Sequence, residues 1–78
     1  MKILLHQRLK ELREEKELLI KDLAKIIEFD ASLVTKWEKD KVRPTYETLI
    51  KLAWLYDVTT DYLLGIEDSF GNKVKRSD

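Results

Sequence analysis

The sequence lacks cysteine and contains few residues that interrupt helices. Because there is no thiol, disulfide bridges and zinc–thiolate sites are excluded. The 78 residues include one proline, Pro44, and two glycines, Gly65 and Gly71, in a chain rich in leucine, isoleucine, lysine and glutamate. Since so few helix breakers accompany so many helix-forming residues, we predict an all-α fold.

The chain also lacks a long apolar run and a surplus of charge. The N-terminal "ILL" at 3–5 is followed at once by His6, Gln7 and Arg8, so it is too short for a signal sequence or a membrane span. The 15 basic residues balance the 15 acidic ones. This balance argues against strong non-specific binding to nucleic acid but allows a local basic patch. We expect a cytoplasmic protein, in keeping with the absence of disulfides.

Residues suited to catalysis or metal binding are sparse. His6 is the single histidine, and there is no glycine-rich loop. The carboxylates are scattered beside lysine or arginine, as in "KELREEKE" at 10–17, so no acid–base pair is evident. We therefore expect no enzymatic activity, no metal site and no cofactor.

Apolar residues recur at helical spacing in five segments. We place helices at about 4–17, 20–27, 31–39, from 46 onward, and 60–64. Asp30, Thr45 and Thr59 are suitable N-caps for the last three, and Gly65 ends the fifth. Together the helices form one domain at 1–66, and the polar residues 67–78 are predicted to be a flexible C-terminal tail.

Only the three residues "EFD" at 28–30 separate the second and third segments. So short a link imposes a sharp angle between two short helices, which is the helix-turn-helix arrangement. Phe29 can insert between these helices and fix the angle.

The segment 31–39 has two different sides. Leu33, Val34 and Trp37 fall together on a helical wheel, and we predict that Trp37 packs in the core. The opposite side carries short polar and basic residues: Ser32, Thr35, Lys36 and Lys39. This pattern alone fits either a solvated helix or a helix in the major groove of DNA, which an acid-free face permits.

The run from Arg8 to Gly65 resembles the lambda-repressor-like, XRE-type helix-turn-helix domains of bacterial and phage regulators. The matching pieces are "RLKELREEK", "DLA", "VTKWEKDKVRPTYETLIKLA" and "VTTDYLLG", in the family's order and spacing, and the run covers about three quarters of the chain. The resemblance implies a compact five-helix domain. It also implies a transcriptional repressor, associated with the bacterial nucleoid, that binds double-stranded DNA sequence-specifically.

The family assigns roles to particular positions. Its third helix lies in the major groove, and base edges would be read by Ala31, Ser32, Thr35 and Lys36. The DNA backbone would be contacted by Lys39, Lys41 and Arg43. Arg13 and Glu38 match a pair that is structural in the family, and we expect it to brace the first helix against the third.

Two sets of positions depart from the family. Leu19 and Ile20 replace the residues that usually bind a phosphate at the start of the second helix, and helical periodicity places Ile20 on the buried side instead. Four residues stand where the family often has glycine in the left-handed region, at a cost of about 1 kcal/mol each. These residues are Glu17, Glu28, Asp40 and Asp57.

Large apolar residues near the C-terminal end suggest self-association. We expect a homodimer whose contact includes Trp54, Leu55, Tyr62 and Ile66. A two-fold dimer would read a near-palindromic operator with half-sites about one DNA turn apart.

A second function stays open. Antitoxins of toxin–antitoxin pairs have the same fold and bind a partner protein through an apolar surface. The neutral net charge and the apolar residues Leu19, Ile20 and Ile26 favour such a protein-interaction module.

Overall fold

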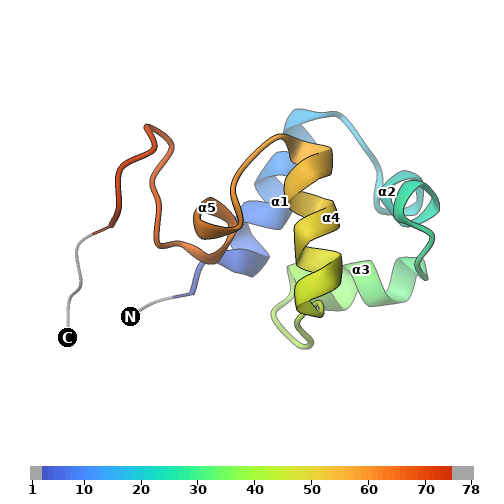
Figure 1. Cartoon of the computed structure of the whole chain (residues 1–78). Helices are drawn as coiled ribbons and strands as arrows, with labels where there is room; N and C mark the ends of the chain where they lie inside the picture. The colour runs from blue at the N-terminus through green and yellow to red at the C-terminus, as the bar shows by residue number, and fades with distance from the viewer. Residues whose placement is uncertain (1–2, 75–78) are drawn as a thin grey trace.

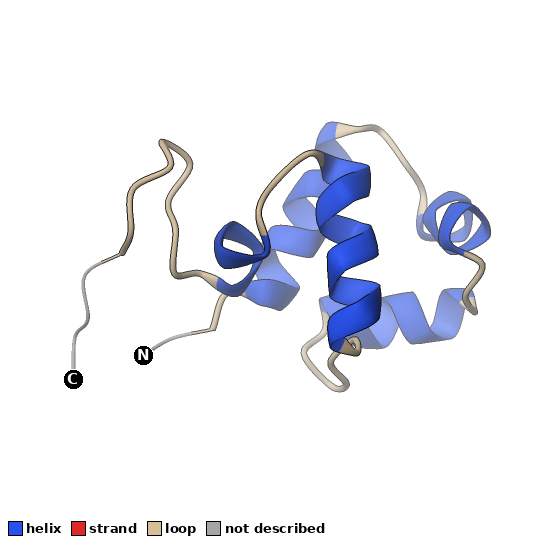
Figure 2. Ribbon diagram, viewed as in Figure 1, coloured by secondary structure: helices blue, strands red, loops and turns tan. Residues whose placement is uncertain are grey.

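A computed structural model describes residues 3–74. Five helices follow one another within these residues: α1 (Leu5–Glu15), α2 (Ile20–Ile27), α3 (Ala31–Glu38), α4 (Tyr46–Tyr56) and α5 (Thr60–Leu64) (Figure 1). The predicted all-α fold is confirmed, and all regular structure in Figure 2 is helical. Residues 1–2 and 75–78, which include the end of the predicted tail, lie outside the described residues.

Two predicted helices are slightly too long. The first begins at Leu5 and ends at Glu15 instead of spanning 4–17, because Glu17 is left-handed and the N–H of Leu18 donates to Arg13 O at 3.1 Å. This bond closes the last turn. The third helix ends at Glu38, and Lys39 is its C-cap.

The N-caps agree with the sequence prediction. The side chain of Asp30 accepts from the N–H of Ser32, that of Thr45 from Thr48, and that of Thr59 from Tyr62. Leu19 precedes α2 and offers no such acceptor; its own N–H donates to Asp22 Oδ2 at 3.1 Å. Three helices therefore begin with a side-chain cap, and α2 does not.

All four residues in the family's glycine positions have a positive φ. The angles are 55° at Glu17, 61° at Glu28, 57° at Asp40 and 54° at Asp57. Each residue lies just beyond a helix, where the left-handed conformation ends it. The left-handed turns therefore carry the strain that a side chain adds there.

The core joins all five helices. Leu52 and Leu63 are completely buried, and Val34 is 1% exposed. The remaining buried apolar residues are Leu5, Leu9, Leu23, Ala24, Trp37, Ala53 and Tyr56. The most extensive contacts join α2 to α3, α1 to α3, α1 to α5 and α4 to α5, so α1 packs against both the helix-turn-helix and α5.

The chain folds back after α5. The N–H of Val74 donates to Ile66 O at 2.8 Å, and an isolated antiparallel bridge joins Glu67 to Lys73. The Arg8 guanidinium donates to the carbonyl oxygens of Tyr62 and Glu67 and lies 4.1 Å from the centre of the Tyr62 ring. The segment is thus held to α1 at Glu67, and Lys73 and Val74 pair with the residues that directly follow α5. The flexibility proposed for 67–78 stays a prediction.

Candidate nucleic-acid interface

The turn between α2 and α3 is short and closed. The N–H of Phe29 donates to Ala24 O at 2.8 Å, which ends α2 after the left-handed Glu28. The Phe29 ring meets the Trp37 ring edge-on, with 5.4 Å between the centroids and 70° between the planes. This aromatic contact holds the turn against α3 and helps to fix the angle between the two helices.

The inner side of α3 belongs to the core. Val34 is 1% and Trp37 3% exposed, so Trp37 packs as predicted. Leu33 is half-buried and also packs against the core. The side chain of Trp37 is therefore not available to stack on a ligand.

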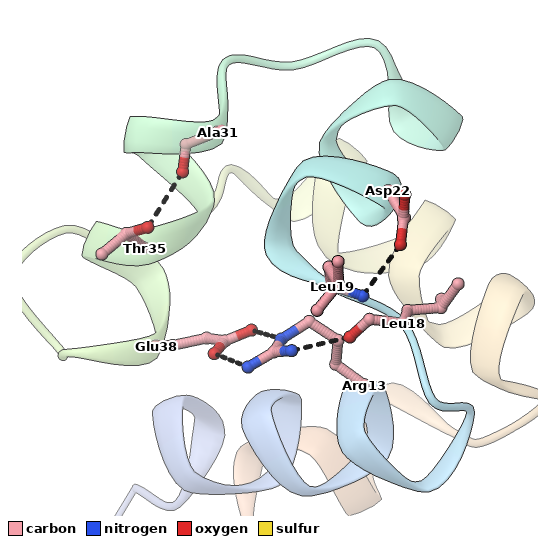
Figure 3. Close-up of polar contacts among 7 residues, drawn as sticks. All are labelled: Arg13, Leu18, Leu19, Asp22, Ala31, Thr35 and Glu38. Carbon is pink, nitrogen blue, oxygen red and sulfur yellow. Dashed lines mark hydrogen bonds and ion pairs between the residues drawn. The ribbon is translucent and has the colours of Figure 1, made fainter.

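Three of the four predicted base-reading residues, Ser32, Thr35 and Lys36, lie on the outer side of α3, whereas Ala31 packs partly against the core. Ser32 and Lys36 are exposed, and Ala31 and Thr35 are half-buried. The Thr35 hydroxyl donates to Ala31 O at 3.1 Å (Figure 3). One long cation, two small side chains and a hydroxyl thus form a narrow surface without a carboxylate, which suits the major groove.

Arg13 and Glu38 meet at the junction of α1 and α3. Arg13 Nε donates to Glu38 Oε2 at 2.7 Å, and Nη2 donates to Oε1 at 3.0 Å. Arg13 Nη1 also donates to Leu18 O at 2.7 Å (Figure 3). The side chains are 10% and 6% exposed, so this bidentate pair lies inside the protein.

The contact between Arg13 and Glu38 changes the pKa of Arg13, and the charge of Glu38 also affects the pKa of Tyr56. The hydrogen bonds that Arg13 donates to Glu38 raise the pKa of Arg13, and burial opposes this rise. On α4, burial raises the pKa of Tyr56 to about 12, with a further contribution from the charge of Glu38. The Tyr56 hydroxyl has no hydrogen-bond partner among the described residues. The Tyr56 phenol is therefore held in its neutral form beside the ion pair.

The loop after α3 carries the predicted backbone contacts. Lys39, Lys41 and Arg43 are all exposed. The N–H of Lys41 donates to Lys36 O at 3.0 Å, which folds the loop back onto the end of α3. Three exposed cations therefore follow α3 directly in a loop that is bonded back to the end of that helix.

An exposed carboxylate in the same loop offsets part of this positive charge. Asp40 Oδ1 lies 3.7 Å from Arg43 Nε, and Asp40 Oδ2 lies 4.0 Å from His6 Nδ1. Sequence reasoning did not identify these contacts. The spacing of Asp40 and Arg43 was a weak signal for the first, whereas only the fold brings His6 to the loop.

The start of α2 differs from the family pattern in the way the sequence indicates. The Leu19 side chain is 58% exposed and can neither donate nor accept a hydrogen bond. Ile20 is half-buried and packs against the core. Ile20 thus packs at least partly on the core side of α2, as helical periodicity predicted.

The predicted dimer residues are not equally accessible. Trp54 is 78% and Ile66 37% exposed. Leu55 packs against the core, and Tyr62 is half-buried beneath Arg8. Sequence reasoning missed two more exposed residues on α4, Tyr46 and Ile50. They precede Trp54 by eight and four positions, and this spacing was the available signal.

A hollow of about 550 Å³ lies away from α3, between the end of α1, the α4–α5 turn and the residues after α5. Four carboxylates line it: Glu15, Asp57, Glu67 and Asp68. They would repel phosphate, so the hollow is no part of a nucleic-acid surface. Within residues 3–74 there is no cluster of metal-ligating side chains and no helix long and apolar enough to cross a membrane.

A protein-family model described as helix-turn-helix matches residues 9–63. The chain belongs to the lambda-repressor-like helix-turn-helix family. The match includes α2, α3 and the turn between them, and it extends over most of the core. The family indicated by the sequence motifs is thereby confirmed.

Three relatives carry the words "HTH-type transcriptional regulator" in their names. The chain is 38% identical over 72 residues to uncharacterized YobD of Bacillus subtilis, covering 92% of this chain and 64% of that protein. It is 38% identical over 64 residues to ImmR of Bacillus subtilis, covering 82% and 50%. It is also 38% identical over 62 residues to DdrOP3 of Deinococcus deserti, covering 78% and 48%. The chain thus spans about half to two thirds of these relatives' lengths.

Proposed function

We propose that this domain binds double-stranded DNA sequence-specifically and regulates transcription, as a repressor at the bacterial nucleoid. The observation that carries this proposal is the outer side of α3. It is free of carboxylates, it follows the turn of a helix-turn-helix, and it is followed by a loop with three exposed cations. The names of the relatives, all of them transcriptional regulators, support it. We propose no enzymatic activity and no cofactor.

In this proposal α3 lies in the major groove and the following loop lies against phosphates. Lys36 donates to O6 and N7 of a guanine, with Ala31, Ser32 and Thr35 beside it on neighbouring base pairs. Lys39, Lys41 and Arg43 contact the DNA backbone, which fixes the register of α3 without reading sequence. Because Leu19 and Ile20 offer no polar side chain, only main-chain N–H groups remain for a phosphate at the start of α2, and affinity is expected to be modest.

We also propose that the protein acts as a homodimer on a near-palindromic operator. The contact includes Trp54, Leu55, Tyr62 and Ile66, and the high exposure of Trp54 is its main support. Sedimentation equilibrium of the wild type and of Trp54→Lys tests this contact. A dimer that dissociates in the variant supports it, whereas equal masses for both proteins would remove Trp54 from the interface.

The proposed function is tested by selecting bound duplexes from a randomised DNA library at about 0.1 M salt, where surface charges are still effective. Enrichment of one near-palindromic sequence is expected. The enriched duplex and a scrambled duplex are then titrated with the protein. Equal affinities for the two duplexes would contradict sequence-specific recognition.

A second candidate function rests on α2. Leu19, which immediately precedes α2, is 58% exposed, and Ile26 on α2 is 53% exposed; seven positions separate these apolar residues. Such a surface suits a partner protein, as in the antitoxin-like alternative. A protein that co-purifies in stoichiometric amount, and is lost from Leu19→Thr/Ile26→Lys, would support this function. Enrichment of a DNA site with no co-purifying protein would count against it.

A further inference from the structure

The outer side of α3 consists of two adjacent lines of side chains. Ala31 and Thr35 are four positions apart, so they lie on one line, and Ser32 and Lys36 form the other. Ser32 and Lys36 are exposed and polar, whereas Ala31 and Thr35 are half-buried and Ala31 also packs against the core. The two lines therefore offer different chemistry to a base pair.

The hydroxyl of Thr35 has its hydrogen committed to the helix. Thr35 Oγ1 donates to Ala31 O at 3.1 Å, one turn earlier in α3 (Figure 3). While this bond persists, the oxygen can still accept a hydrogen bond but cannot donate one. What remains for an apolar contact is the Thr35 methyl group, on the same line as the Ala31 methyl group. This line of α3 thus offers a methyl group and a hydrogen-bond acceptor, but no hydrogen-bond donor.

In the major groove, an apolar side chain distinguishes thymine by its C5-methyl group, and alanine and the threonine methyl are suited to this contact. We infer that Thr35 reads a 5-methylpyrimidine, normally thymine, through its methyl group, next to the base pair read by Lys36. This inference rests on the proposed function and narrows it. The recognition site then contains a thymine whose methyl group, rather than a polar edge, determines affinity at that position.

The same geometry would also allow the Thr35 oxygen to accept a hydrogen bond from a base, and substitutions at Thr35 can distinguish the two contacts. If the Thr35 oxygen accepts a hydrogen bond from adenine N6 or cytosine N4, the hydroxyl is needed and the methyl is not. Thr35→Val keeps a methyl group and removes the hydroxyl. Thr35→Ser keeps the hydroxyl, with its bond to Ala31 O, and removes the methyl. The two variants are therefore matched controls for each other.

The experiment starts from the enriched duplex and replaces each thymine in turn by deoxyuridine, which removes the C5-methyl group alone. The loss of one buried methyl predicts about fourfold weaker binding at a single position in each half-site, for the wild type and for Thr35→Val. Thr35→Ser is expected to bind the thymine and the deoxyuridine duplexes equally. Thermal unfolding of both variants, followed by circular dichroism, verifies that they fold like the wild type.

Several results would overturn the inference. One is a deoxyuridine effect that persists in Thr35→Ser, because another residue then contacts the methyl group. Another is that Thr35→Val loses binding while Thr35→Ser retains it, which would make the hydroxyl the reading group. A site without thymine, or one unaffected by deoxyuridine, would have the same consequence. A library without any enriched duplex would instead overturn the proposed function, and the inference with it.

Discussion

Lys36 and Glu38 are two positions apart on α3, yet their surroundings are opposite. Glu38 lies inside, 6% exposed, with both carboxylate oxygens bound to Arg13. Lys36 lies outside among small side chains. The two sides of this short helix therefore have different roles. The buried charge of Glu38 holds α3 to α1, and the exposed charge of Lys36 is available to a binding partner. Substitutions on the two sides should therefore change different measured quantities.

The largest effect is expected from breaking the buried pair. Glu38→Ala leaves the Arg13 guanidinium buried without its anion, which should lower the free energy of unfolding by about 3–5 kcal/mol. Urea denaturation measures this loss. Replacing both residues, as Arg13→Met/Glu38→Leu, should cost less than Glu38→Ala alone, because no charge is left unpaired. A loss below 1 kcal/mol in Glu38→Ala would contradict the bracing role.

The matching change on the outer side is Lys36→Ala. It should leave the free energy of unfolding nearly unchanged and reduce discrimination at one base pair by about 1–3 kcal/mol. Titration of duplexes that carry each single substitution in the enriched site measures this loss. An unchanged preference at every position would remove Lys36 from the base-reading residues.

Tyr56, on α4, allows a test of the packing beside the buried Arg13–Glu38 pair. Its buried hydroxyl lacks a partner among the described residues, so Tyr56→Phe is expected to raise the free energy of unfolding by about 1 kcal/mol. Its pKa is raised to about 12 from the ordinary 10, so the phenol ionises first in the unfolded chain, and the wild type loses stability as the pH rises from 10 to 12 but not below pH 10. Denaturation at pH 9 and pH 11 measures both effects. Between pH 9 and pH 11 the free energy of unfolding should fall less for Tyr56→Phe than for the wild type. An equal fall would contradict the raised pKa of Tyr56.

Backbone strain in the left-handed turns affects stability independently of the residues on either side of α3. Glu17 has a φ of 55°, where glycine has no steric cost, so Glu17→Gly should raise the free energy of unfolding by about 1 kcal/mol. Glu14→Gly, three positions earlier within α1, is the matched control and should lower it by about 1 kcal/mol. Two changes of the same sign would mean that the left-handed turn is not strained.

The smallest effect is expected at the exposed pair in the loop. Asp40 and Arg43 are 44% and 59% exposed, so Asp40→Asn should change the free energy of unfolding by less than about 1 kcal/mol. It should nevertheless strengthen binding to every duplex alike, because a carboxylate is removed beside the three loop cations. Binding titrations at several salt concentrations measure this gain, which should shrink as salt rises. A gain limited to one sequence would place Asp40 at a base edge.

Local features of the fold were predictable from the sequence. Helix positions follow from apolar periodicity, and the caps at Asp30, Thr45 and Thr59 follow from side-chain chemistry that acts within a few residues. The positive φ at Glu17 and Asp57 followed from the family's glycine positions, not from the residues themselves. The errors were confined to the ends of α1 and α3, where one or two residues belong to the turns.

Contacts between distant segments were not predictable in the same way. Arg8 reaches Glu67 O, and His6 approaches Asp40, only because the packing of α1 brings these segments together. The bond from the Thr35 hydroxyl to Ala31 O depends on which rotamer the side chain adopts, which periodicity does not determine. The Arg13–Glu38 contact was expected through the family resemblance alone, since the charges are 25 positions apart.

The division between the two sides of α3 is tested most directly by selecting duplexes in parallel with three proteins: the wild type, Lys36→Ala and Tyr56→Phe. We predict one near-palindromic sequence for the wild type and the same sequence for Tyr56→Phe. For Lys36→Ala we predict lost preference at a single base pair of each half-site. An identical sequence from all three proteins, or a changed one from Tyr56→Phe, would contradict this division.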